Sequence, residues 1–84
     1  MKLIFAEQAW EDYVQWQQQD KRMVKRINEL IENTVRAPFT GIGKPEPLKH
    51  ALAGYWSRRI TEEHRMVYKP DKDALLLAQL RYHY

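Results

Sequence analysis

The sequence YWSRRITEEHRMVYK, residues 55–69, predicts two short β-strands joined by a tight turn. Tyr55–Ile60 and Arg65–Lys69 contain several of the aromatic and β-branched residues that favour strands, and residues 61–63 have the composition of a turn. A third strand, Ala74–Tyr82, follows a second short turn. Because both connections are short, consecutive strands should pair antiparallel and form a three-stranded meander.

On the N-terminal side of this meander, the chain predicts a strand followed by a helix. Met1–Phe5 is short and apolar, and in the helix after it Trp10, Tyr13 and Val14 have the i, i+3, i+4 spacing of an apolar stripe. We expect that stripe to face the sheet. Asp20 is a predicted N-cap of a second helix.

The second helix is predicted over Lys21–Asn33. Its apolar residues share one side and its charged residues take the other; the apolar set is Val24, Ile27, Leu30 and Ile31. With a tight turn near Asp20, the two helices would form a hairpin that packs both stripes on one face of a sheet. The predicted fold class is therefore α+β, with the N-terminal strand and the meander completing one small twisted sheet.

Length and composition restrict the class of protein. A chain of 84 residues is expected to form a single domain over residues 1–84. Cysteine is absent, which excludes disulfides, thiolate metal sites and a cysteine nucleophile, and fits a reducing cytoplasm. No apolar run approaches the ~20 residues of a membrane span. We therefore expect a cytoplasmic protein with no membrane partner.

Positive charge is concentrated in the second part of the chain. Residues 1–33 hold five Lys and Arg against six Asp and Glu, whereas residues 34–84 hold nine against five. An anionic partner should bind there, and nucleic acid is the commonest partner of a basic surface.

Residues 36–54 contain three of the four prolines and all three glycines, so they predict a long surface loop. A structureless connection of this length is usually functional. Glu46 lies between Pro45 and Pro47, which restrict its backbone and would aim its carboxylate as a general base requires. The alternative is an ordinary exposed loop glutamate.

Two arginines of neighbouring strands form a candidate anion site. An antiparallel register can place Arg65 beside Arg59 on an open sheet face, where the two guanidinium groups repel each other unless an anion lies between them. The alternative is a pair of solvated arginines held by Glu62 or Glu63.

Histidine is the side chain best suited to proton transfer near neutral pH, and His83 would serve if the last strand holds it on the sheet. A frayed surface histidine is the alternative. A metal site built from His50, His64 and His83 is disfavoured, because they are far apart in sequence and lack i, i+4 spacing. No phosphate-binding Gly-rich loop or serine triad is present, so no cofactor is expected.

Several motifs occur together in this chain: Lys44-Pro45-Glu46-Pro47-Leu48-Lys49-His50, Gly54, Trp56-Ser57-Arg58-Arg59-Ile60, Glu63-His64-Arg65, Val67-Tyr68 and Arg81-Tyr82-His83-Tyr84. They resemble the YoeB toxins of the RelE/ParE superfamily, from YoeB–YefM type II toxin–antitoxin systems. The resemblance spans nearly the whole chain and implies a RelE-like microbial ribonuclease fold. It implies an mRNA endoribonuclease that acts in the ribosomal A site, inhibits translation and binds a YefM-like antitoxin. Homodimerisation is a further expectation.

The resemblance also implies roles for individual residues. Glu46 would be the general base, Arg65 the phosphate clamp and His83 the general acid. Further active-site positions are matched by Tyr84, Lys49 and Arg59, with Lys44 and His50 beside them as RNA-binding candidates. Cleavage would need no metal, because the RNA 2′-hydroxyl is itself the nucleophile, and would leave a 2′,3′-cyclic phosphate and a 5′-hydroxyl.

Two rival functions have different requirements. A ParE-like toxin that poisons DNA gyrase without hydrolysing RNA needs no constellation of Glu46, Arg65 and His83. A non-catalytic RNA-binding module would bind RNA or ribosomes and leave the RNA ends unchanged.

Overall fold

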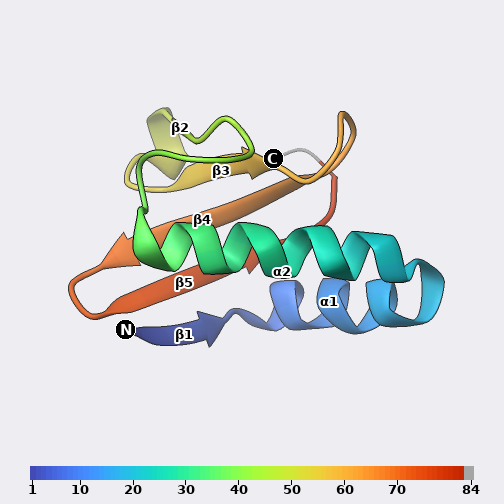
Figure 1. Cartoon of the computed structure of the whole chain (residues 1–84). Coiled ribbons are helices and arrows are strands. Elements are labelled where there is room, and N and C mark those ends of the chain that lie inside the picture. Colours follow the sequence, from blue (N-terminus) through green and yellow to red (C-terminus); the bar gives the residue numbers. More distant parts are fainter. Residues whose placement is uncertain (83–84) are drawn as a thin grey trace.

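In the computed structural model, which describes residues 1–82, five strands form one sheet with two helices packed against it (Figure 1). The elements in chain order are β1 (Lys2–Phe5), α1 (Glu7–Gln19), α2 (Lys21–Arg36), β2 (Glu46–Pro47), the 3₁₀ helix η1 (His50–Leu52), β3 (Trp56–Arg59), β4 (Arg65–Asp71) and β5 (Ala74–Gln79). The strand order across the sheet is β1-β5-β4-β3-β2. The expected α+β class is confirmed.

The antiparallel meander of β3, β4 and β5 is confirmed, and β1 joins it by pairing parallel to β5. The predicted end of the third strand at Tyr82 is wrong, because β5 ends at Gln79. The backbone of Leu80 leaves the ladder since side chains of α1 take both of its polar groups: Asp12 accepts its N–H and Trp16 donates to its C=O.

The helical hairpin is also confirmed, and one residue makes the turn. The N–H of Asp20 bonds the carbonyl of Trp16 at the end of α1, and its carboxylate accepts the N–H of Arg22 at the start of α2. Ala6 gives α1 no side-chain cap. The second helix extends to Arg36, beyond the predicted Asn33, and no helix within residues 1–82 is long and apolar enough to cross a membrane.

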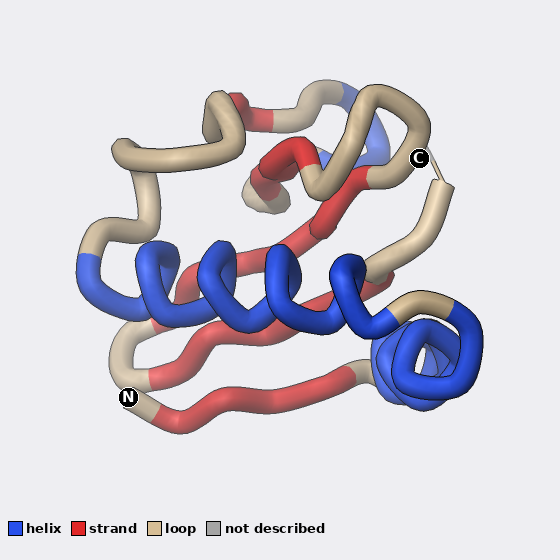
Figure 2. The backbone as a smooth tube through the Cα atoms, turned by 45° about the vertical axis from the view of Figure 1, so that its right-hand side comes forward, coloured by secondary structure: helices blue, strands red, loops and turns tan. Residues whose placement is uncertain are grey.

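The apolar pattern predicted the buried face of α2 but not that of α1. In α2 the expected residues Ile27, Leu30 and Ile31 are buried against the sheet, which α2 crosses in Figure 2. In α1 the prediction was only partly right: Tyr13 packs against the core, but the buried positions are Ala9, Asp12 and Trp16, and Trp10 is 53% exposed. Hydrogen bonding of Asp12 and Trp16 to the chain after β5 outweighs the burial of the apolar stripe.

A fully buried arginine lies between the sheet and the connection that follows α2. Arg58 of β3 makes five hydrogen bonds, one from Nε to the hydroxyl of Tyr68 and two from each terminal nitrogen. The acceptors of the terminal nitrogens are Asn33 Oδ1 and the carbonyls of Ala37, Thr40 and Ile42, at 2.5–3.1 Å. All guanidinium donors are satisfied, as a buried cation requires.

The phenol of Tyr68 continues this network, because it accepts from Arg58 and donates to the carbonyl of Pro38 at 2.7 Å. Burial raises the pKa of Tyr68, although the guanidinium of Arg58 acts in the opposite direction. The hydroxyl therefore keeps the proton that it donates.

The predicted long loop is thus well held rather than free. Gly41 has φ +115°, and a Cβ there would lie 2.0 Å from the Asn33 Oδ1 that also binds Arg58. Only glycine fits this backbone conformation and this space. The connection from residue 37 to residue 43 packs onto the sheet and leads the chain into β2.

We expect Arg58→Met to lower the free energy of unfolding by about 3 kcal/mol or more, because several part-buried acceptors lose a charged donor. Urea denaturation followed by Trp fluorescence measures this. The matched control is Arg36→Met, an exposed arginine of α2, with a change within about 0.5 kcal/mol. Equal effects of the two substitutions would contradict the role of Arg58.

Candidate active site

Strand register brings three of the predicted site residues onto one face of the sheet. Arg59 of β3 pairs directly with Arg65 of β4, and Ser57 pairs with Glu46 of β2 on one side and with Val67 on the other. Residues directly opposite each other in a sheet point to the same face. Their neighbours in β4, Met66 and Tyr68, belong to the core under the helices. Glu46, Ser57 and Val67 therefore form one line of side chains across the strands, and Arg59 and Arg65 form the next line. Both lines lie on the face of the sheet away from α2.

The turn between β3 and β4 holds Arg65 by hydrogen bonds and Arg59 only weakly. Arg65 Nη1 donates to the carbonyls of Thr61 at 2.9 Å and Glu62 at 3.4 Å. Arg59 Nη1 lies 3.9 Å from the carboxylate of Glu62, which is almost fully exposed. An exposed pair at that distance contributes little. Glu62 is thus only a weak partner of Arg59.

The proline and glycine content suggested that Glu46 lies on a free loop, but the residue lies in strand β2. It is exposed, but its strand runs along β3: the N–H of Arg59 bonds the carbonyl of Gly43 at 2.7 Å, and the N–H of Leu48 bonds that of Tyr55 at 2.9 Å. Two backbone anchors therefore flank Glu46 and fix its position relative to the arginines.

The other basic candidates flank this segment. Lys44, Lys49 and His50 are exposed, and Lys44 and His50 have left-handed backbones, with φ 52° and 58°. This conformation is uncommon for residues other than glycine and costs about 1 kcal/mol or more at each position. Residues held in this way often lie at functional sites, but their roles in RNA binding stay predictions.

The expected open sheet face is partly closed. Ser57 is 1% exposed and Val67 2%, although both point away from the helices. The hydroxyl of Ser57 has no hydrogen-bond partner among the described residues. Ser57 lies two residues before Arg59 in β3, so strand alternation alone indicates that the two share a face and that Ser57 forms the base of the site.

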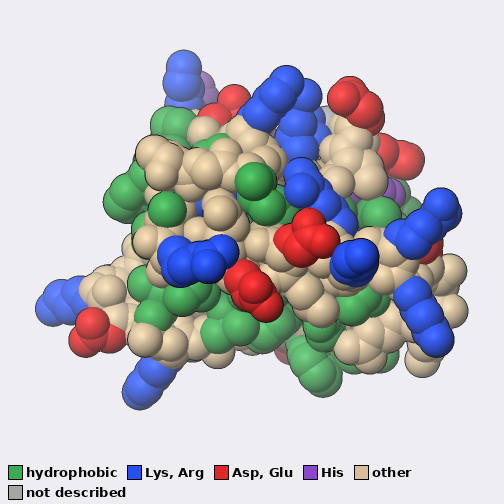
Figure 3. All heavy atoms as spheres, in the orientation of Figure 1, with side chains coloured by type: hydrophobic (Ala, Val, Ile, Leu, Met, Phe, Trp, Pro, Cys, Tyr) green, Lys and Arg blue, Asp and Glu red, His purple; other side chains and the backbone are tan. Residues whose placement is uncertain are grey.

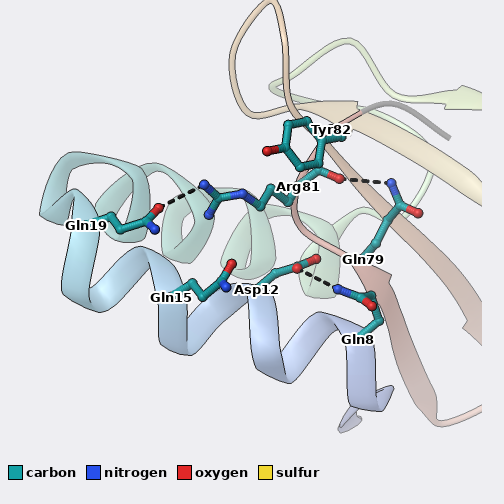
Figure 4. A pocket seen from close by; sticks show the side chains of 7 residues that line it. All are labelled: Gln8, Asp12, Gln15, Gln19, Gln79, Arg81 and Tyr82. Atoms are coloured by element: carbon teal, nitrogen blue, oxygen red, sulfur yellow. Dashed lines mark hydrogen bonds between the residues drawn. The ribbon is translucent and has the colours of Figure 1, made fainter.

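The chain after β5 is fixed by α1 (Figure 4). Asp12 accepts the N–H of Leu80 and Trp16 donates to its carbonyl, each at 2.9 Å. The guanidinium of Arg81 stacks 4.0 Å from the centre of the Trp16 ring and donates to Gln19 at 2.8 Å. These anchors were not predicted, because Asp12 and Gln19 are polar and Trp16 lies outside the expected apolar stripe of the helix.

The backbone of Tyr82 lies beside Arg65, one of the two arginines of the site. The N–H of Arg65 bonds the carbonyl of Tyr82 at 3.1 Å, and the N–H of Tyr82 donates to His64 Nδ1 at 2.8 Å. His83 and Tyr84 lie outside the described residues, so their predicted roles as general acid and as catalytic residue stay predictions.

Residues 1–82 show neither a uniformly basic face over α2 nor a group of metal ligands. The face covered by α2 carries acidic and basic side chains intermixed rather than a patch of one sign (Figure 3). Within these residues, no three His, Asp or Glu side chains are grouped as ligands of a metal ion.

Solved structures define the class of protein. The YoeB/ParE toxin of Agrobacterium tumefaciens is 55% identical and superposes with a TM-score of 0.97 over 100% of both chains. Two structures from Staphylococcus aureus, a YoeB dimer and a heterotetrameric YoeB–YefM complex, contain chains 50% identical, with TM-scores of 0.94 and 0.92 over 100% of this chain and 98% of those. The fold is that of the small α+β RelE-like toxins.

Sequence comparison narrows the class to a family. Toxin YoeB of Escherichia coli K12 is 66% identical over 84 residues, which cover 100% of both chains. Residues 5–84 match the family described as the YoeB-like toxin of bacterial type II toxin–antitoxin systems. The chain belongs to this family, and the resemblance seen in its motifs is confirmed.

We expect Trp16→Phe to destabilise the protein by about 1–3 kcal/mol, because the buried carbonyl of Leu80 loses its donor while most of the ring packing is kept. Urea denaturation measures the change. Trp10→Phe, on the exposed side of the same helix, is the control and should shift stability by no more than about 0.5 kcal/mol.

Proposed function

We propose that this toxin is a ribosome-dependent mRNA endoribonuclease of the cytoplasm, which cleaves mRNA in the ribosomal A site and so inhibits translation. The observation that supports the proposal is that Glu46, Arg59 and Arg65 lie on the same face of the sheet, with Glu46 in the line of side chains next to that of the two arginines. A carboxylate beside two permanently charged guanidinium groups suits a phosphodiester and its neighbouring hydroxyl.

The reaction needs three protein functions and no metal. Glu46 removes the proton of the 2′-hydroxyl, and the 2′-oxygen attacks the adjacent phosphorus. Arg65, assisted by Arg59 or Lys49, stabilises the charge of the phosphorane-like transition state. His83 protonates the departing 5′-oxygen as its bond to phosphorus breaks. The products are a 2′,3′-cyclic phosphate and a 5′-hydroxyl.

The division of roles follows from side-chain chemistry. Arginine stays protonated at physiological pH, so the base must be a carboxylate or a neutral imidazole. Glu46 is exposed and meets this need at a fixed position, whereas the arginines can only supply charge and hydrogen bonds. Tyr84, the last residue, would stack on or hydrogen-bond the RNA, and Lys44 and His50 would contact its backbone.

Two protein partners belong to the proposal. The Staphylococcus aureus relative has been solved with YefM and as a dimer. For this chain we infer a YefM-like antitoxin whose acidic or apolar segment covers the basic face, folding as it binds. Association as a homodimer is inferred in the same way.

We predict that Glu46→Gln lowers the single-turnover rate of mRNA cleavage by ~10² or more, because the amide has the shape of the carboxylate but cannot accept the proton. Primer extension on a translating message measures the rate and maps the cut. The control Glu32→Gln changes an exposed carboxylate of α2 and should leave the rate unchanged. Intact RNA with the wild-type toxin, together with gyrase trapped on DNA, would instead support the gyrase-poisoning alternative.

We also predict that Arg65→Lys lowers the cleavage rate by ~10² while ribosome binding stays close to that of the wild type. Lysine retains the charge but lacks the planar fork that holds two phosphate oxygens. Quench-flow cleavage assays and ribosome co-sedimentation separate the two effects. Arg36→Lys is the matched control on α2, and a parallel loss of binding and cleavage by Arg65→Lys would contradict a role in the transition state.

A further inference from the structure

The backbone of Tyr82 is held on both sides by two consecutive residues, His64 at the end of the turn between β3 and β4 and Arg65 at the start of β4. Its N–H donates to His64 Nδ1 at 2.8 Å, and its carbonyl accepts from the N–H of Arg65 at 3.1 Å. Tyr82 itself has a left-handed backbone, with φ 61°. A side-chain-bearing residue holds that conformation at a cost of about 1 kcal/mol or more, so these two bonds oppose its relaxation.

His64 is fixed in the position from which it holds Tyr82. The backbone N–H of His64 donates to the hydroxyl of Thr61 at 3.1 Å, and its backbone carbonyl accepts the N–H of Ile60 at 2.9 Å. The imidazole lies edge-on to Trp16 at 4.9 Å between ring centres and 5.2 Å from the ring of Tyr82. Its side chain is only 12% exposed. The ring is therefore held in one orientation before any ligand binds.

The hydrogen bond also defines which nitrogen carries the proton. Since the Tyr82 N–H is the donor, Nδ1 must offer its lone pair, and the proton of the neutral ring lies on Nε2. Nε2 faces the carboxylate of Glu63 at 3.7 Å, and the guanidinium of Arg81 stacks on the same Trp16 ring. His64 is thus an acceptor in this structure, and its chemistry differs from that of the predicted general acid.

We propose that His64 is a positioning residue for RNA cleavage: its Nδ1 fixes the backbone of Tyr82, the residue that precedes the proposed general acid His83 in the sequence. The inference rests on the proposed ribonuclease function. It assigns His64 no contact with RNA, since its effect passes through the Tyr82 peptide.

Two substitutions separate the acceptor from the ring. His64→Asn keeps an acceptor, because Oδ1 stands at the same number of bonds from the backbone as Nδ1, but it removes the ring. His64→Phe keeps the ring against Trp16 and removes the acceptor. We expect the single-turnover rate of ribosome-dependent cleavage to fall roughly ten-fold in the Phe variant, because the Tyr82 N–H loses the acceptor that holds it, and to be largely restored in the Asn variant. Ribosome binding should be unchanged in both.

Hydrogen exchange provides a readout that does not depend on activity. The Tyr82 amide, observed by ¹⁵N NMR, should be protected in the wild type and in His64→Asn and should exchange rapidly in His64→Phe, while the urea midpoint of the Phe variant shows that it remains folded.

Different outcomes would overturn the positioning role of His64 and the ribonuclease function. Cleavage by the Phe variant at the wild-type rate, or equal losses in the Phe and Asn variants, would overturn the positioning role of His64. A wild-type toxin that leaves RNA intact in the presence of ribosomes would instead overturn the ribonuclease proposal.

Discussion

The five hydrogen bonds of the buried Arg58 determine how the rest of the molecule is arranged. They tie the chain after α2 to the middle of the sheet, through Asn33 and three backbone carbonyls. The chain leaves this region as an edge strand paired with β3, so the position of Glu46 is fixed by a cation more than ten residues away in sequence. A polar network of this kind is stabilising only when every donor and acceptor is paired, as it is here.

A second polar network holds the other end of the candidate site. Asp12 and Trp16 of α1 take the polar backbone groups of Leu80, and His64 and Arg65 take those of Tyr82. Residues 80–82 follow the end of β5, so the sheet alone gives their backbone no strand with which to form hydrogen bonds. Arg58 thus places the Glu46 strand, and side chains of α1 and of the turn before β4 place residues 80–82, beside Arg59 and Arg65, although these parts are far apart in sequence.

Sequence patterns predicted the parts of the fold that depend on local composition and periodicity. The hairpin at Asp20, the meander and the pairing of Arg59 with Arg65 follow from capping, short turns and strand alternation. The buried face of α1 was misjudged, because Asp12 is polar and its burial depends on a partner at Leu80. The fixed conformation of the segment around Glu46 was also not predicted, since its composition indicates a flexible loop. The hydrogen bonds of Arg58 that hold the preceding connection depend on three-dimensional packing. Motif resemblance identified the family, which periodicity and charge could not.

Surface connections usually accept substitutions, insertions and deletions more readily than strands or helices do. The segment around Gly41 is an exception, because an added methyl group would collide with the Asn33 oxygen that Arg58 already uses. In a saturation mutagenesis experiment, this outwardly exposed stretch should have the substitution profile of a protein interior. Length changes there would displace the strand that follows, so natural sequence variation should spare the spacing between α2 and β2 more than solvent exposure alone would suggest.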